Sequence, residues 1–173
     1  MTQTIDLHAM NKAIEYASEP SFRPSGEIPT EGMISVRVRY TECDPMNVAH
    51  HASYIPWLEM GRTELLREAG VSYASLEQAG VFLVVTKLDV KYRRPIVYDD
   101  VVEIRTRAHA SGRIKIRHSY EVKLKERMGA KPDPESDPRV PLDGVCAVAT
   151  SEIACVNAEG RPVPLPEWLV PAQ

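Results

Sequence analysis

Residues 40–69 decide the fold of this chain, with the sequence YTECDPMNVAHHASYIPWLEMGRTELLREA. In the second half of the stretch, apolar side chains recur at helical spacing, as Ile55, Leu58, Leu65, Leu66 and Ala69. Pro56 is tolerated in a first helical turn, and Gly70 is suited to the C-terminal cap. Arg62 interrupts the apolar stripe. The pattern predicts one long helix over residues 55–69.

The turn before this helix carries a carboxylate, Asp44. The N–H groups of a first helical turn lack partners within the helix, so they can stabilise a developing negative charge. A nucleophile or general base beside such a helix end meets the minimal needs of acyl transfer. From spacing alone a turn or cap role for Asp44 is the simpler interpretation, because Asp-Pro is a common turn dipeptide.

Five segments have the patterns of strands. Four alternate apolar and polar side chains, as half-buried strands do: residues 33–40, 84–92, 102–108 and 114–124. The fifth, residues 145–156, is apolar on both faces, which indicates a strand covered on both sides or paired across a subunit contact. Strands without helical crossovers favour an antiparallel sheet, hence an α+β fold. One helix covers little of such a sheet, and we infer that a second copy of the chain supplies the missing cover.

The remaining segments are loops and an extension. Residues 1–17 have weak helical periodicity and precede a linker, so we divide the chain into an extension, residues 1–32, and a domain, residues 33–173. Ser111-Gly112 is a candidate tight turn. Four prolines within residues 128–141 indicate a surface loop or a partly disordered excursion.

Composition excludes several classes of protein. At 173 residues the chain has the length of one domain, and its net charge of −3 gives no general attraction to nucleic acid or anionic membranes. The cysteines, Cys43, Cys146 and Cys155, are odd in number and lack C-x-x-C spacing, which argues against a zinc site and a disulfide framework. We expect a reduced, cytoplasmic protein without a membrane span.

Several motifs together carry a family resemblance. They are VRYTECDPMNVAHHASY at residues 38–54, WLE at 57–59, RTELL at 62–66, LDVKYRRP at 88–95 and YDD at 98–100. With them the chain resembles hotdog-fold acyl-CoA thioesterases of the 4-hydroxybenzoyl-CoA thioesterase type, including their YbgC-like relatives. The resemblance implies a five-stranded antiparallel sheet wrapped around one long central helix, to which this chain adds the N-terminal helical extension. It also implies homodimers with active sites at the interface, often assembled into homotetramers.

The resemblance assigns roles to site residues. Asp44 becomes the catalytic carboxylate, which attacks the thioester carbonyl or activates a water, and His51 an auxiliary. Backbone N–H groups near His51 and Ala52 become the oxyanion donors. Candidate substrate contacts are Tyr54, Glu59 and Arg113, with Arg113 near the phosphates of coenzyme A, which is part of the substrate; no metal or other cofactor is expected. The chain departs from the family at Asn47, His50 and Ser53, where Gly, an aromatic residue and Asn are frequent.

Alternative roles accompany several of these residues. Cys43 has no adjacent cation to form a thiolate, so we reject it as a nucleophile. Ser53 is better interpreted as a helix N-cap, and His118, in an apolar row, as a satisfied core or interface histidine. Glu59 and Glu64 are typical partners of Arg62 and Arg67, but they are the second choice for the catalytic carboxylate.

The strand cations, such as Lys87, Lys91, Arg93, Lys115 and Arg117, are by default on solvated faces.

For the function, an acyl carrier protein thioesterase and a non-catalytic acyl-CoA-binding module stay open as alternatives. A hydratase is less favoured, because its acid/base pair is not evident.

Overall fold

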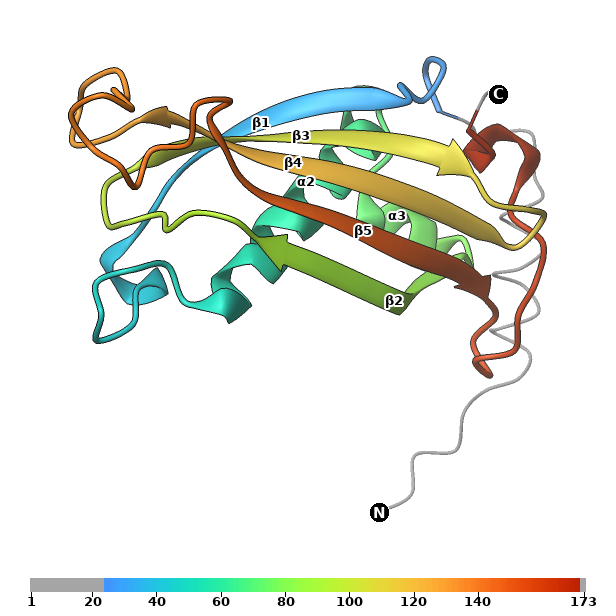
Figure 1. The fold of residues 1–173 in the computed structure, drawn as a ribbon. Helices are drawn as coiled ribbons and strands as arrows, with labels where there is room; N and C mark the ends of the chain where they lie inside the picture. Colours follow the sequence, from blue (N-terminus) through green and yellow to red (C-terminus); the bar gives the residue numbers. More distant parts are fainter. Residues whose placement is uncertain (1–23, 172–173) are drawn as a thin grey trace.

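The structure, a computed structural model, describes residues 24–171 and contains one curved sheet with a helix against it (Figure 1). The elements are β1 (Glu31–Arg37), η1 (Tyr40–Glu42), η2 (His51–Ser53), α2 (Tyr54–Glu68), α3 (Tyr73–Gln78), β2 (Phe82–Tyr92), β3 (Val101–Ala110), β4 (Lys115–Glu126), β5 (Val145–Val156) and η3 (Glu167–Leu169). The helix expected within residues 1–17 lies outside the described residues, and the division at residue 33 stays a prediction.

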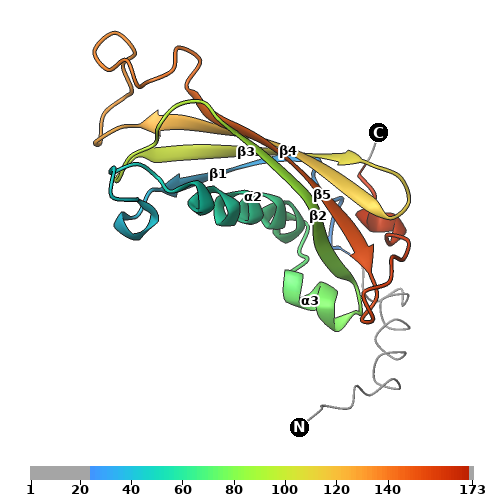
Figure 2. The ribbon, with the colours of Figure 1, turned by 60° about the horizontal axis from the view of Figure 1, so that its bottom comes forward.

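The sheet has the strand order β1-β3-β4-β5-β2, and every neighbouring pair is antiparallel. Figure 2 shows the sheet curving over α2, with α3 beside the start of β2. This confirms the expected hotdog architecture of five antiparallel strands around one long helix. Gly70 ends α2 as expected, with φ +78° and its N–H on the carbonyl of Arg67.

The buried face of α2 differs from the predicted stripe. Its buried residues are Tyr54, Trp57, Leu58, Gly61, Leu65 and Leu66. Ile55, predicted to be buried, is 47% exposed. Tyr54 faces the sheet, and the next residue of an α-helix is rotated by about 100° around the helix axis, so Ile55 faces solvent. A Cβ added at Gly61 would collide with Oγ1 of Thr106 on β3, so glycine allows the helix to approach the sheet closely here.

A second helix, α3, was not predicted. It has only six residues, which is too short for a clear periodic pattern. Its N-cap, Ser72, accepts a hydrogen bond from the Ser75 N–H at 3.0 Å, and Gly80 follows its end with φ +74°. A serine before the segment and a glycine after it are the signals that could have identified this helix.

The strands β5 and β2 occupy different environments. β5 lies between β4 and β2 and is buried on both faces for most of its length, as predicted. β2 is a sheet edge, and a register shift between Val85 and Lys87 breaks the predicted alternation. Val84, Leu88 and Tyr92 are therefore exposed instead of half-buried in the single chain, and Val85, on the opposite face, is exposed as well.

The loop of residues 128–141 is tied to the sheet. Arg127 forms ion pairs of 2.9 Å with Asp100, which is fully buried, and with Asp137 in the loop. Val140 is buried against the main core. The loop is therefore anchored from both ends, and of the two predicted alternatives the surface loop agrees with the structure.

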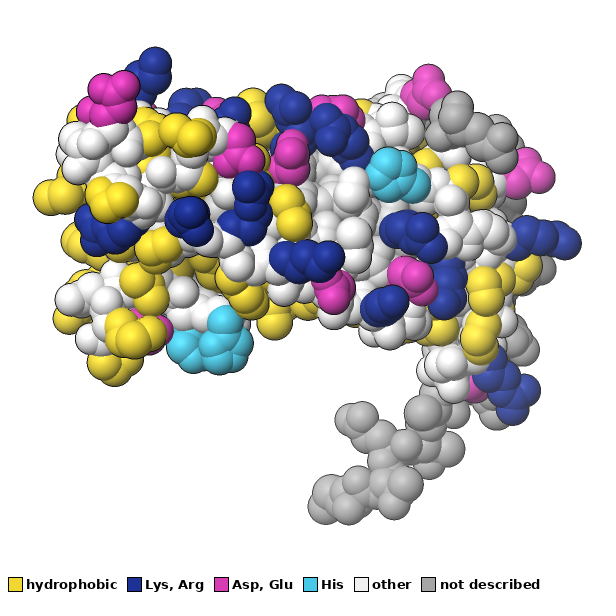
Figure 3. All heavy atoms as spheres, in the orientation of Figure 1, with side chains coloured by type: hydrophobic (Ala, Val, Ile, Leu, Met, Phe, Trp, Pro, Cys, Tyr) yellow, Lys and Arg dark blue, Asp and Glu magenta, His cyan; other side chains and the backbone are white. Residues whose placement is uncertain are grey.

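Charged side chains cover the strands on the surface that Figure 3 shows, where Lys and Arg alternate with Asp and Glu. Glu31 pairs with Arg105 and Arg107, and Glu152 pairs with Lys115 and Arg117. Lys115 and Arg117 thus lie on a mixed-charge strand face open to solvent, as predicted, and Arg105 and Arg107 do the same.

Candidate functional site

Asp44 organises a tight turn and leaves one carboxylate oxygen open. Its Oδ1 accepts the Met46 N–H at 2.8 Å, and its backbone N–H donates to the carbonyl of Val48 at 2.9 Å. Asn47 has φ 60°, a left-handed conformation that Asn tolerates and that explains the family's preference for Gly there. Among the described residues no donor binds Oδ2. The turn role and a reactive role of Asp44 are thus compatible.

Glu42, which is only 7% exposed, holds this turn against α2. Its carboxylate accepts the Arg39 N–H at 2.8 Å, the Arg39 guanidinium at 2.8 Å and the Trp57 Nε1–H at 2.9 Å. Its carbonyl accepts the His50 N–H and the Ser53 hydroxyl, both at 2.8 Å. Ser53 occupies the N-cap position, but its hydroxyl makes this bond instead of capping the helix, which corrects the prediction.

The entry to α2 presents an open backbone donor. The Ala52 N–H donates to Nδ1 of His50 at 3.2 Å, so one of the two predicted oxyanion donors is engaged. Within residues 24–171 the His51 N–H has no acceptor. The carbonyl of His51 accepts the Tyr92 hydroxyl at 3.0 Å, which fixes the helix entry to the end of β2.

A pocket of about 350 Å³ gathers these groups. It is lined by Asp44, Val48, Ala49, His51, Tyr54, Tyr92, Arg93, Arg94 and Pro95. The predicted residues Asp44, His51 and Tyr54 are therefore brought together. Tyr54 packs edge-to-face on Tyr92, with ring centroids 4.9 Å apart, and burial raises the pKa of its hydroxyl, which stays protonated.

Two predicted substrate contacts lie outside this pocket in the single chain. Glu59 is exposed and pairs with Arg62 at 3.6 Å, and Arg113 is exposed before β4. Two other arginines line the pocket instead. Arg93 was predicted on a solvated strand face, and Arg94 was given no role. Arg93 pairs with Asp143 at 2.9 Å, whereas Arg94 has no carboxylate within ion-pair distance in the described part of the chain. The RRP motif at residues 93–95, directly after a strand, is the signal that could have identified them.

The structure supports the rejection of cysteine chemistry. Burial, and then the charges of Asp44 and Glu42, raise the pKa of the Cys43 thiol. Burial raises the pKa of Cys146 to about 11.

Residues 24–171 contain no group of three His, Cys, Asp or Glu side chains that could hold a metal ion. None of the helices in these residues is long and apolar enough to cross a membrane.

Known proteins share this architecture and sequence pattern. Residues 38–173 match the sequence profile of the thioesterase-like superfamily. The chain belongs to this superfamily. Its fold is similar to the crystal structure of a DHNA-CoA thioesterase from Staphylococcus aureus, with a TM-score of 0.65 and 25% identity over 78% of this chain and 80% of that one.

Two curated bacterial proteins are similar in sequence. A putative acyl-CoA thioesterase from Bacillus subtilis, YneP, is 31% identical over 50% of this chain and 63% of its own length. The acyl-CoA thioester hydrolase YbgC from Escherichia coli is 42% identical over 41% of this chain and 53% of its own length. The matches thus span between half and two thirds of these relatives.

Proposed function

We propose that this protein is a thioesterase that hydrolyses an acyl-CoA to a free acid and coenzyme A. The observation that carries the proposal is the pocket in which Asp44, with an open Oδ2, lies beside His51, the first residue of the short helix η2 that leads into α2. A carboxylate and an unpaired N–H at a helix end are the two groups that thioester hydrolysis needs. The relatives named for acyl-CoA hydrolysis support the choice of substrate.

Asp44 acts on the thioester in one of two ways. As a nucleophile, Oδ2 bonds to the carbonyl carbon, the C–S bond breaks, and the thiolate of coenzyme A leaves and takes up a proton; water then hydrolyses the mixed anhydride. As a general base, Asp44 accepts a proton from the water that attacks the carbonyl directly. In both routes the His51 N–H stabilises the oxyanion, and the His51 side chain assists. Neither route uses a metal or redox cofactor.

Coenzyme A is an anion, and cations at the pocket would bind its phosphates. Arg93 and Arg94 are in place within the single chain. Because the three cysteines are free thiols, we place the reaction in the reducing cytoplasm.

We also propose a homodimer in which two β2 edges pair antiparallel, with further assembly into a homotetramer. Such pairing places the Phe82 end of one β2 beside the Tyr92 end of the other. Arg113 lies toward the Phe82 end of β2 in its own chain. Lys115, two residues after it, pairs with Ala154 of β5, and Ala154 pairs on its other side with Val84 of β2. Arg113 of the partner subunit would then approach the Asp44 pocket, which reconciles the predicted contact with its position.

The test is a panel of acyl-CoA thioesters assayed with the full chain, with Asp44→Asn and with Asp133→Asn as the control. Asp133 is an exposed carboxylate in the loop after β4, outside the pocket and not on β2. We expect Asp44→Asn to lower kcat/KM by at least about a hundredfold and Asp133→Asn to change it less than about twofold. Unchanged turnover in Asp44→Asn would remove Asp44 from the reaction. If only acyl groups on a carrier protein were hydrolysed, the carrier and not coenzyme A would be the substrate.

A further inference from the structure

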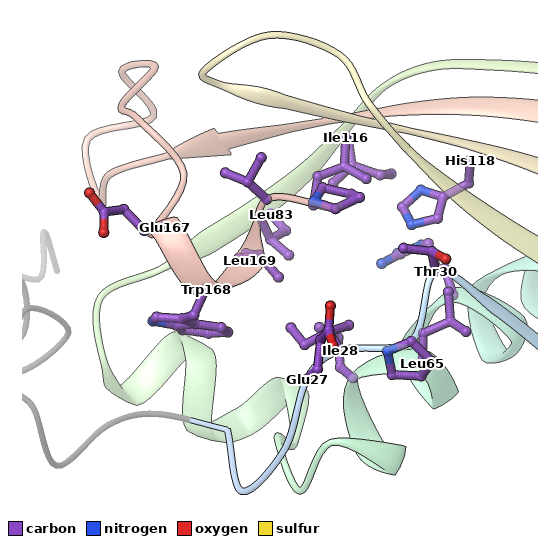
Figure 4. Close-up of a pocket in the computed structure, with 16 residues that line it drawn as sticks. Glu27, Ile28, Thr30, Leu65, Leu83, Ile116, His118, Glu167, Trp168 and Leu169 are labelled. Carbon is purple, nitrogen blue, oxygen red and sulfur yellow. The ribbon is translucent and has the colours of Figure 1, made fainter. Parts of the chain in front are cut away.

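A second cavity lies at the other end of α2. It has a volume of about 250 Å³ and is closed by residues 27–30 on one side and by residues 167–171 on the other (Figure 4). Most of its lining is apolar and comes from the segment before β1, from α2, β2, β4 and β5, and from the C-terminal segment: Ile28, Leu65, Leu66, Leu83, Ile116, Ile153, Trp168 and Leu169. No residue lines both this cavity and the Asp44 pocket.

His118 reaches this cavity from β4. Within the single chain it is not a satisfied core histidine, and the alternative of an interface histidine stays a prediction. Its side chain is 7% exposed, and among the described residues Nδ1 has no hydrogen-bond partner. Burial, followed by the charges of Arg62 and His109, lowers the pKa of His118 to about 3, so the ring is neutral at neutral pH. A neutral imidazole offers one N–H donor and one acceptor, and leaving the buried Nδ1 without a partner costs stability.

Arg62 lines the same cavity from α2. Its side chain is 10% exposed, and its one ion pair with a residue that the structure describes, to Glu59 at 3.6 Å, involves a carboxylate that is itself 61% exposed. The guanidinium also lies over the ring of Tyr73, 5.6 Å from the centroid. A guanidinium has five N–H donors, and these contacts use few of them. A nearly buried cation with unused donors therefore faces an apolar cavity.

We propose that this cavity binds a small carboxylic acid as its carboxylate, with the head group on Arg62 and His118 and the apolar body against Leu65, Ile116 and Leu169. The cavity is slightly smaller than a typical drug-sized site of about 300 to 1,000 Å³, so a compact acid fits and a whole acyl-CoA does not. Glu27 and Glu167 also line it, but both are exposed to water. In Figure 4 Glu167 points away from His118, so its carboxylate does not occupy the part of the cavity next to His118.

The site is tested by binding, which makes it independent of hydrolysis at Asp44. The intact chain is titrated with straight-chain acids from butanoic to decanoic, with benzoic acid, and with the matching primary amides. Binding is measured by calorimetry and by the fluorescence of Trp168, which lines the cavity. We expect at least one acid to bind at least about tenfold more tightly than its amide, because an ionised group strengthens the hydrogen bonds to Arg62.

Four variants distinguish binding in this cavity from binding in the Asp44 pocket or on the surface. Arg62→Gln is expected to weaken acid binding at least about tenfold. Arg67→Gln, which changes an exposed arginine on the same helix, is expected to alter it less than about twofold. Leu83→Trp fills the cavity without removing a charge and should abolish binding, whereas Asp44→Asn should leave it unchanged. Circular dichroism confirms that each variant is folded.

Three results would overturn the proposal: equal affinity for acid and amide, unchanged acid binding in Arg62→Gln, or full binding in Leu83→Trp. Loss of acid binding in Asp44→Asn would move the acid to the other pocket and also overturn it. Loss of turnover in Asp44→Asn with acid binding retained would support both proposals separately.

Discussion

Replacement of Glu42 by glutamine should destabilise the fold far more than an ordinary surface change. Glu42 is the nearly buried carboxylate that joins the Asp44 turn to α2, through Arg39 on one side and Trp57 on the other. Glutamine has the same shape but only one acceptor oxygen. If that oxygen keeps the bonds of Oε1, the amide NH2 faces the Arg39 N–H, so two donors oppose each other.

The cost follows from these contacts. One buried donor without an acceptor costs about 1 to 3 kcal/mol. The lost charge on the bond to the Arg39 guanidinium adds at most about 1 kcal/mol, because that side chain is 72% exposed and screened by water. The free energy of unfolding should therefore fall by about 2 to 4 kcal/mol. Glu64→Gln is the matched control, since Glu64 also pairs with an arginine three residues away but is more exposed, and it should cost less than about 1 kcal/mol.

The loss should also depend on pH. Burial alone would raise the pKa of the Glu42 carboxyl, but the hydrogen bonds from the Arg39 side chain, the Arg39 backbone and Trp57 together lower it. A carboxyl with a lowered pKa in the folded state stabilises the fold above its unfolded pKa of about 4.3. This stability is lost as the pH falls through the lower folded value. The deficit of Glu42→Gln should thus be complete at neutral pH and shrink below about pH 4.

Urea denaturation followed by far-ultraviolet circular dichroism measures both effects at a fixed protein concentration. Equal losses for Glu42→Gln and Glu64→Gln at neutral pH would refute the argument, because they would show that burial of Glu42 has no energetic consequence. A loss that persisted undiminished at pH 3 would show that the charge of Glu42 is not involved.

Two further predictions concern the loop anchor and the sheet edge. Arg127→Met leaves the buried Asp100 carboxylate without its cation and should lower the free energy of unfolding, measured by urea denaturation, by about 3 to 5 kcal/mol. The control Arg139→Met, at an exposed site, should lower it by less than about 1 kcal/mol. Similar losses in the two variants would contradict the role of burial. Leu88→Lys puts a charge on the β2 edge, which opposes edge-to-edge pairing, and should halve the mass of a β2-paired dimer in light scattering. Leu142→Lys, on a loop, should leave the mass unchanged. An unchanged mass in Leu88→Lys would place the interface elsewhere.

The elements with a strong periodic signal were predictable from sequence. Five strands and α2 were found because alternation and helical spacing persist over many residues. The failures have local causes. Ile55 was assigned to the core in place of Trp57 because a four-turn helix does not by itself fix which line of its surface faces the sheet. The register shift after Val85 is invisible in an alternating pattern, since it depends on how β2 pairs with β5.

The candidate site was predictable in so far as it is local in sequence. Asp44, His51 and Tyr54 lie within eleven consecutive residues, so a motif places them together. Glu42 was not identified, because its importance comes from burial against Trp57, a tertiary contact. Arg93 was assigned to a solvated face for the same reason, since its approach to Asp44 depends on how β2 ends beside the helix entry.

The distribution of charge agrees with the two anion sites that we propose in this acidic chain. A net charge of −3 gives no general attraction, so any anion site depends on arginines that the protein does not neutralise elsewhere. Many surface arginines are paired with acids, for example Arg107 with Glu31 and Arg139 with Asp137. Arg94, without an ion pair in residues 24–171, lies beside Asp44, and Arg62, with a single long one, lies beside His118. Each end of α2 thus has an arginine next to a pocket. These two arginines provide the local attraction for anions that the net charge of the chain does not provide.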